Sequence, residues 1–111
     1  MEKEKLTARS ILLFFVSDIY GATKKFRAGE PAELADRIRK TAVSLSATVN
    51  SVPETADTSD FSRIYPILSS ISVLETYLQL AKRHRFLKDT AALDEKLSEV
   101  KEALYKILGQ R

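Results

Sequence analysis

The chain has 111 residues, no cysteine and a net charge of +3 at pH 7. This length suffices for one domain with a single hydrophobic core and is too short for two. The lack of cysteine excludes a disulfide framework and thiolate chemistry, which is compatible with a reducing compartment. The one candidate membrane segment, Ile11 to Val16, is far shorter than the roughly 20 residues that span a bilayer. It also lacks a signal peptide's cleavage pattern, so we expect a cytoplasmic protein without membrane contact.

Apolar side chains recur in steps of three and four along four segments, which places them on one face of a helix. The steps predict helices over about 6–26, 31–52, 62–85 and 90–108. Helices joined by short connections pack against their neighbours in the sequence. The expected fold is therefore all-α, an antiparallel up-down-up-down four-helix bundle that forms a single domain over residues 1–111.

The apolar run in the first helix wraps more than one and a half turns, so its residues cannot all face one core. Phe14 is expected outside the core, with Leu13 and Tyr20 toward one flank. Two explanations are open. Scattered apolar groups are normal on any protein surface, whereas a large exposed apolar patch usually marks contact with another subunit. In the second case Leu13, Phe14 and Tyr20 are the candidate oligomer contacts.

The second helix carries two neighbouring stripes, and Gly29 and Pro31 mark its start. The stripe expected to face the core consists of Leu34, Ile38, Thr41, Leu45, Thr48 and Val52. A stripe of smaller residues lies beside it, at Ala35, Ala42 and Val49. Small side chains let a neighbouring helix approach closely, so we expect contacts on more than one side of this helix.

Local signals also mark the third and fourth helices. Pro66 has no N–H to donate to the carbonyl of Ser62, so we expect either a kink or a helix start near Arg63. Asp89 or Thr90 can cap the fourth helix by accepting a hydrogen bond from a backbone N–H.

The positive charge is concentrated in a few places. An antiparallel bundle brings the ends of the first and third helices together, with the candidate phosphate contacts Lys24, Lys25, Arg27, Lys82, Arg83, Arg85 and Lys88. Arg39 and Lys40 form a second candidate cluster on the second helix. The alternative is a solvated end of the bundle, where bases complement the negative ends of helix dipoles and nearby acids complement the positive ends.

We find no pattern typical of catalysis. His84 is the only histidine, so a metal site built from paired Glu-x-x-His motifs is excluded. Some four-helix nucleases carry an Arg separated from a His by four to six residues, but the corresponding positions here are Tyr77, Leu78 and Gln79. No glycine-rich phosphate loop is present either. We therefore expect no enzymatic activity, no catalytic residue, no metal and no cofactor.

Several positions together resemble a known family. They are Ile19-Tyr20, Thr23, Phe26, Leu34, Ile38-Arg39-Lys40, Ala42-Val43-Ser44 and Ala47, followed by Leu74-Glu75-Thr76 and Leu80-Ala81. This pattern, over about residues 10–108, resembles the four-helix bundle proteins encoded in intervening sequences of bacterial 23S ribosomal RNA genes. The family's Arg-Arg-Ala-Ala-x-Ser segment corresponds to Arg39 to Ser44. The chain departs from the family at Thr48 to Val52 and in its acidic connection 53–59.

The resemblance implies a small cytoplasmic bundle that assembles into a homopentameric ring and has no known enzymatic activity. A related branch, the accessory variability determinants of diversity-generating retroelements, binds nucleic acid through a basic surface and associates with a reverse transcriptase. We therefore expect a homo-oligomeric scaffold or adaptor that binds RNA or DNA, with a reverse transcriptase or another protein as a further candidate partner. The alternative is a protein–protein interaction module that binds no nucleic acid.

Overall fold

The computed structural model describes the backbone of residues 2–51 and 61–108 and the side chains of residues 8–51 and 62–106. It contains four helices: α1 (Glu2–Ala22), α2 (Gly29–Ser51), α3 (Phe61–Arg83) and α4 (Ala91–Leu108). The described ranges contain no strand, so the predicted all-α fold is confirmed. None of the helices in these ranges is long and apolar enough to cross a membrane.

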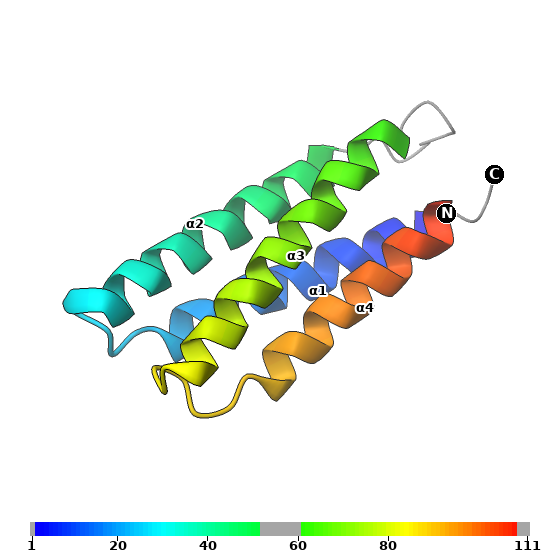
Figure 1. Ribbon diagram of the computed structural model, residues 1–111. Helices are drawn as coiled ribbons and strands as arrows, with labels where there is room; N and C mark the ends of the chain where they lie inside the picture. Colours follow the sequence, from blue (N-terminus) through cyan, green and yellow to red (C-terminus); the bar gives the residue numbers. More distant parts are fainter. Residues whose placement is uncertain (1, 52–60, 109–111) are drawn as a thin grey trace.

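Each helix packs against the helices before and after it, and α4 closes the bundle by packing against α1 (Figure 1). The connections 23–28 and 84–90 lie at the same end of a bundle that measures 45 × 21 × 19 Å. Near the other end, Nη2 of Arg9 in α1 donates to the carbonyl of Asn50 in α2 (3.2 Å). The start of one helix thus lies beside the end of the next, so adjacent helices run antiparallel and α1 and α3 occupy opposite corners.

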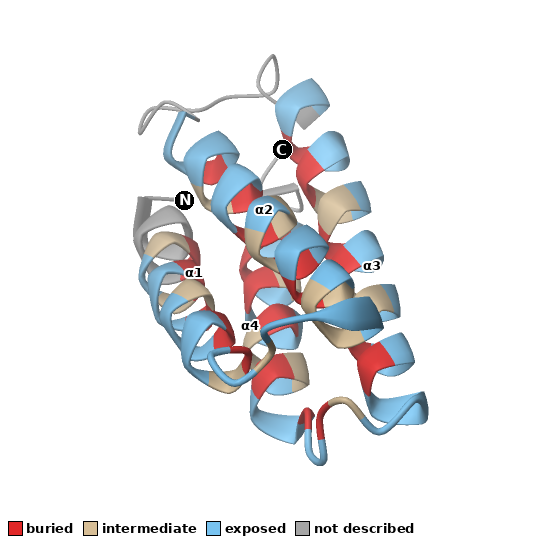
Figure 2. Ribbon diagram, turned by 90° about the vertical axis from the view of Figure 1, so that its left-hand side faces the viewer, coloured by how far each residue is buried: buried red, intermediate tan, exposed pale blue. Residues whose placement is uncertain are grey.

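The buried side chains form one stripe on each helix, and the stripes face the bundle axis (Figure 2). The largest fully buried ones are Leu12, Phe15, Ile19, Ile38, Leu45, Ile64, Ile67, Ile71, Leu74, Leu78 and Leu97. Phe14 points away from this core and is 63% exposed, as the sequence predicts.

The buried stripe of α2 differs from the prediction. Ile38 and Leu45 are buried, but so are Ala35, Ala42 and Val49, which were expected beside the stripe. Thr41 is only half-buried and Thr48 is exposed, while Val52 lies outside the described residues. The reason is that α2 packs against both α1 and α3. Its most buried line runs between these two contacts, where small side chains allow both neighbours to approach.

The first helix ends at Ala22, earlier than the predicted end near Phe26. Thr23 continues the hydrogen bonding through its backbone N–H and its Oγ1, which both donate to the carbonyl of Ile19. Beyond it the chain forms a turn, in which the backbone N–H of Phe26 donates to the carbonyl of Thr23 (3.1 Å). Phe26 still packs against the core. The spacing of apolar residues therefore continues past the end of α1, and the boundary predicted from this spacing, near Phe26, is wrong.

The start of α3 lies close to one of the two predicted possibilities. The helix begins at Phe61, two residues before Arg63, and Pro66 lies inside it. The start of α1, at Glu2, lies four residues before the predicted one, and the end of α4 agrees with the prediction. The remaining bounds differ from the predicted ones by one or two residues, which is the usual uncertainty of helix ends.

The predicted cap of α4 is confirmed. The carboxylate of Asp89 accepts a hydrogen bond from the backbone N–H of Ala91 (2.9 Å), which satisfies one of the donors at the helix start. Thr90 is buried, and its Oγ1 donates to the carboxylate of Asp94 (2.9 Å). These bonds fix the connection 84–90 to the first turn of α4.

Two half-buried lysines of α4 form ion pairs with the neighbouring helices. Nζ of Lys96 lies 2.8 Å from the carboxylate of Asp18 in α1, and Nζ of Lys101 lies 3.1 Å from that of Glu75 in α3. The hydrogen bond that Lys96 donates to the carboxylate of Asp18 raises the pKa of Lys96 above its ordinary value. A raised lysine pKa stabilises the fold at every pH below the ordinary value, and the contribution is lost only as the pH rises through the raised one. The contribution of Lys96 is therefore fully present at neutral pH.

The end of α1 is tied to α2 by Arg39. Its Nε donates to Oγ1 of Thr23 (2.7 Å), and Thr23 is only 1% exposed. Its Nη2 lies 3.4 Å from the carbonyl of Tyr20, and the guanidinium carbon lies 4.5 Å from the centre of the Tyr20 ring. Thr23 thus accepts from Arg39 while donating to Ile19.

We expect Thr23→Val to lower the free energy of unfolding by about 1–3 kcal/mol, because Arg39 loses a half-buried hydrogen-bond acceptor while the side-chain shape is kept. Urea denaturation measures the change. The control is Thr48→Val: Thr48 is exposed and donates only to the carbonyl of Ser44 in its own helix. This control should change the stability by less than about 0.5 kcal/mol. Equal effects of the two variants would contradict a role for the link between Thr23 and Arg39.

Candidate nucleic-acid interface

The first group of candidate phosphate contacts lies on the connection between α1 and α2. Lys24, Lys25 and Arg27 are all exposed there. Phe26, between them, packs against the core, and Nζ of Lys25 lies 5.5 Å from the centre of its ring. One anchored aromatic residue therefore holds three outward basic side chains at the end of the bundle.

The second group lies at the end of α3. The backbone N–H of Phe86 donates to the carbonyl of Ala81 (2.8 Å), and that of Arg85 donates to the carbonyl of Lys82 (3.0 Å). This pair of bonds is the Schellman motif, which ends a helix with one residue in the left-handed conformation. That residue is Arg85, whose φ is 61°. The ring of His84 stacks on Phe86, with centroids 5.7 Å apart.

Both groups project at the same end of the bundle (Figure 1). We name this surface the basic end, and it consists of Lys24, Lys25, Arg27, Lys82, Arg83, Arg85 and Lys88. All of its side chains are exposed. Among the residues that the structure describes, none of them forms an ion pair with a carboxylate. The predicted meeting of the two connections is therefore observed, and their charges are not neutralised within the described part of the chain.

The second predicted cluster is arranged differently. Arg39 is half-buried and holds Thr23 and Tyr20, as described above. Lys40 pairs with Asp36 one turn earlier in α2, at 3.0 Å. Both cations already have partners within the fold, which makes them weaker candidates for phosphate binding than the basic end.

Helix dipoles explain only part of the basic end. Lys82 and Arg83 lie in the last turn of α3, where positive charge is favourable. The rest of the basic end lies outside the helices, in the connections 23–28 and 84–90. Acids at the same end have structural roles as well, since Asp89 caps α4 and Glu30 lies in the first turn of α2. Lys24, Lys25 and Arg85 lie within three residues of the ends of α1 and α3, where positive charge is also favourable. A solvated end that only matches the dipoles does not account for Arg27 and Lys88, which lie five residues beyond these ends.

The sequence analysis did not identify the backbone of Arg85 as unusual. Glycine is the usual residue at this position of a Schellman motif because the left-handed conformation is strained for residues with a Cβ. The missing glycine or asparagine after Lys82 to His84 was the only available signal. Strain of this kind tends to occur at functional sites, where the side chain has a role that glycine cannot fill.

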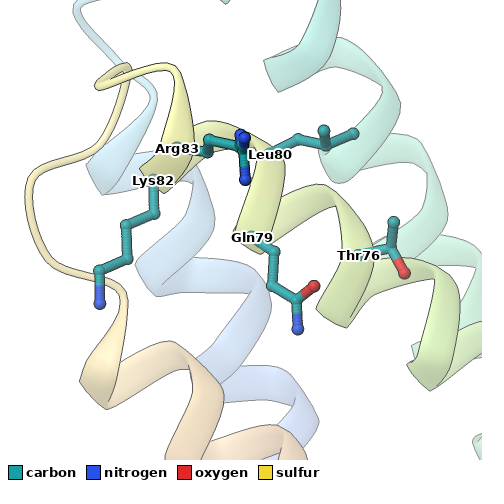
Figure 3. Close-up of a pocket in the computed structure, with 5 residues that line it drawn as sticks. All are labelled: Thr76, Gln79, Leu80, Lys82 and Arg83. Atoms are coloured by element: carbon teal, nitrogen blue, oxygen red, sulfur yellow. The ribbon is translucent and has the colours of Figure 1, made fainter.

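The described residues also form a groove beside the basic end. Within them, no group of three His, Cys, Asp or Glu side chains is arranged to hold a metal ion. A groove of about 530 Å³ is lined by the exposed side chains Thr76, Gln79, Leu80, Lys82 and Arg83, all from α3 (Figure 3). It adjoins the basic end, because Lys82 and Arg83 belong to both.

Comparisons of this chain with family models, with curated proteins and with solved structures find no match. The similarity to the 23S intervening-sequence proteins therefore stays a prediction, and the function has to be inferred from the residues and their geometry.

We expect Arg85→Gly to raise the free energy of unfolding by about 0.5–1 kcal/mol, because relief of the left-handed strain outweighs the greater entropy of glycine in the unfolded chain. Arg83→Gly removes the same charge from a helical position and should lower it by a similar amount. Thermal and urea unfolding measure both. Shifts in the same direction for the two variants would show that Arg85 is not strained.

Proposed function

We propose that this chain is a non-enzymatic, homo-oligomeric scaffold or adaptor of the cytoplasm that binds RNA or DNA through the basic end. The observation that carries the proposal is the set of exposed bases on two connections, none paired with a carboxylate in the described part of the chain. Nucleic acid is the partner whose regular phosphates match several such charges at once.

The size of the basic end sets the mode of binding. The bundle is 21 × 19 Å in cross-section, which corresponds to roughly six base pairs at 3.4 Å each. Flexible lysines and arginines on a flat end contact the phosphate backbone rather than base edges. Binding is therefore insensitive to sequence and steeply dependent on salt. Contact with five phosphates gives a slope of about −4 to −5 for log K against log salt concentration.

The family resemblance supports the same function and adds two expectations. It implies a homopentamer, and it implies association with a reverse transcriptase or another protein. The exposure of Leu13 (66%), Phe14 (63%) and Tyr20 (47%) supports an interface between subunits, because these apolar groups gain from being covered.

The same apolar surface supports the second candidate, a protein–protein interaction module that uses its charges only for solubility. This function requires a stable assembly but no nucleic acid. The two candidates differ in one property, which is salt-sensitive binding at the basic end.

We expect the double variant Lys82→Glu with Arg83→Glu to abolish binding to both a mixed RNA and a duplex DNA, because it replaces two phosphate contacts by repulsion. Fluorescence anisotropy at several salt concentrations measures the affinity. The matched control is Lys106→Glu in the last turn of α4, which reverses a charge at the opposite end of the bundle. Its affinity should stay within about threefold of the wild type.

Unchanged affinity in the double variant would remove the end of α3 from the interface. A wild-type protein that forms an oligomer but binds neither nucleic acid at low salt would refute the nucleic-acid function and favour the interaction module.

A further inference from the structure

The helices α1 and α3 carry almost no charge along most of their length. Residues 10–23 contain one charged side chain, Asp18, and residues 64–81 contain one, Glu75. Each of these acids forms an ion pair with a lysine of α4. The outward faces of α1 and α3 are therefore uncharged over residues 10–23 and 64–81, and Lys82 and Arg83 follow at the end of α3. By contrast, α4 carries charged residues along its whole length.

The outward face of α1 combines two large apolar side chains with small ones. We name it the α1 face, and it consists of Ser10, Leu13, Phe14, Ser17 and Gly21, all exposed. These positions return to one side of the helix at steps of three and four. A Cβ built on Gly21 would meet nothing within 4 Å. Leu13 and Phe14 therefore project from a surface that otherwise allows another helix to approach closely.

The outward face of α3 is grooved. We name it the α3 groove, and it consists of Ser72, Val73, Thr76, Gln79 and Leu80, all exposed. Two hollows on this helix share Thr76, one toward Val73 and the other toward Leu80 and Arg83. Figure 3 shows Thr76, Gln79 and Leu80 along the second hollow. Leu80 also lines another hollow, together with Leu34 and Arg37 of α2.

The two hydroxyl groups of the α3 groove already have partners. Oγ1 of Thr76 donates to the carbonyl of Ser72 (3.0 Å), and Oγ of Ser72 lies 3.4 Å from the carbonyl of Leu68. Covering a hydroxyl that is already hydrogen-bonded avoids the penalty of an unsatisfied donor. An apolar partner can therefore cover Ser72 and Thr76 at little cost.

The projecting pair and the groove lie at the same height on opposite sides of the bundle. Asp18 is level with Lys96, and Glu75 is level with Lys101. Five residues of helix separate the two lysines, or roughly 7.5 Å. Because α4 runs antiparallel to α1 and α3, Glu75 lies level with residue 13 of α1, to within about one turn. Leu13 and Phe14 are thus at the height of Thr76.

We propose that the α1 face of one copy docks into the α3 groove of a second copy. When the second copy is displaced sideways from the first, without a shift along the bundle axis, Leu13 and Phe14 of one copy lie over Thr76 of the other. The two hollows of the α3 groove meet at Thr76. An uncharged face suits this partner because no charge has to be removed from water. The inference rests on the homo-oligomer of the proposed function and names its contact surfaces.

The two surfaces lie on opposite corners of the bundle, so the contact is heterologous: each copy uses α1 toward one neighbour and α3 toward the other. Such contacts close into a ring or continue as a fibre, depending on the rotation between copies. Neighbouring copies are parallel, so their basic ends lie on the same side of the assembly. The charged face of α4 stays in water.

A mixing experiment tests this arrangement. One variant carries Leu13→Glu and Phe14→Glu, and the other carries Val73→Glu and Thr76→Glu, all at exposed positions. Both altered surfaces are then acidic, so they repel each other in the mixture. Light scattering coupled to size exclusion should find a wild-type assembly and two monomeric variants. An equimolar mixture should form a one-to-one dimer and nothing larger, because only one intact pair of surfaces is left. Ser98→Glu, on the exposed face of α4, is the control and should keep the wild-type mass.

Other outcomes would overturn the proposal. The proposal is wrong if the wild type is monomeric, if the mixture stays monomeric, or if either charged variant keeps the wild-type mass. A dimer of either variant alone would show a contact of like with like. Circular dichroism checks that the charged variants fold. If one does not, two serine variants replace them: one carries Leu13→Ser with Phe14→Ser, and the other carries Val73→Ser with Leu80→Ser. Anisotropy at the basic end, measured on the same samples, reports nucleic-acid binding separately, so failure of the contact is distinguishable from failure of the proposed function.

Discussion

A helix in this bundle packs against two neighbours and leaves the helix at the opposite corner almost out of contact. Each helix therefore buries one stripe, and roughly half of its circumference stays outward. Since Leu12, Phe15 and Ile19 already fill the inward side of α1, the additional apolar residues Leu13 and Phe14 have no place in the core. The outward apolar surface is thus a consequence of the core, and its composition decides what the molecule can contact.

The ion pairs of α4 divide the surface into regions of different character. Lys96 and Lys101 neutralise Asp18 and Glu75, which leaves the outward faces of α1 and α3 without net charge. The charges that remain in the connections 23–28 and 84–90 are nearly all positive, and none of these bases forms an ion pair with a carboxylate in the described part of the chain. One bundle therefore presents an end suited to polyanions and two sides suited to apolar contact. The separation matters because charges within an apolar contact would oppose assembly.

The sequence predicted the features that depend on the local spacing of apolar residues. It missed the features that depend on a single contact between residues far apart in the chain. The four helices, the outward position of Phe14 and the cap at Asp89 all followed from spacing and residue type. The end of α1 did not, because Thr23 completes the last turn with a hydroxyl that is held in place by Arg39. Helix propensities describe single residues, so they do not predict a hydrogen bond between Thr23 and the distant Arg39.

Two further features could not be predicted from the sequence for the same reason. The buried line of α2 depends on two neighbours at once, so the strongest apolar period, which includes Thr41 and Thr48, is not the most buried one. The left-handed backbone of Arg85 arises because the chain turns toward α4 so that Leu87 reaches the core. For the candidate site, the sequence identified the basic residues and their common end, while the structure separated Arg39 and Lys40 from the others.

The proposed assembly and the proposed ligand influence each other through electrostatics. Parallel copies place their basic ends side by side, and repulsion among them opposes assembly, most strongly at low salt, where screening is weak. A nucleic acid that bridges these ends removes the repulsion and stabilises the contact between α1 and α3. By thermodynamic linkage, the assembled form then binds nucleic acid more tightly than a single bundle does. Salt acts on the two steps in opposite directions, since it weakens phosphate contacts and relieves the repulsion between neighbouring ends. In the proposed assembly the basic end and the uncharged sides therefore act together, because a bound polyanion stabilises the contact between neighbouring copies.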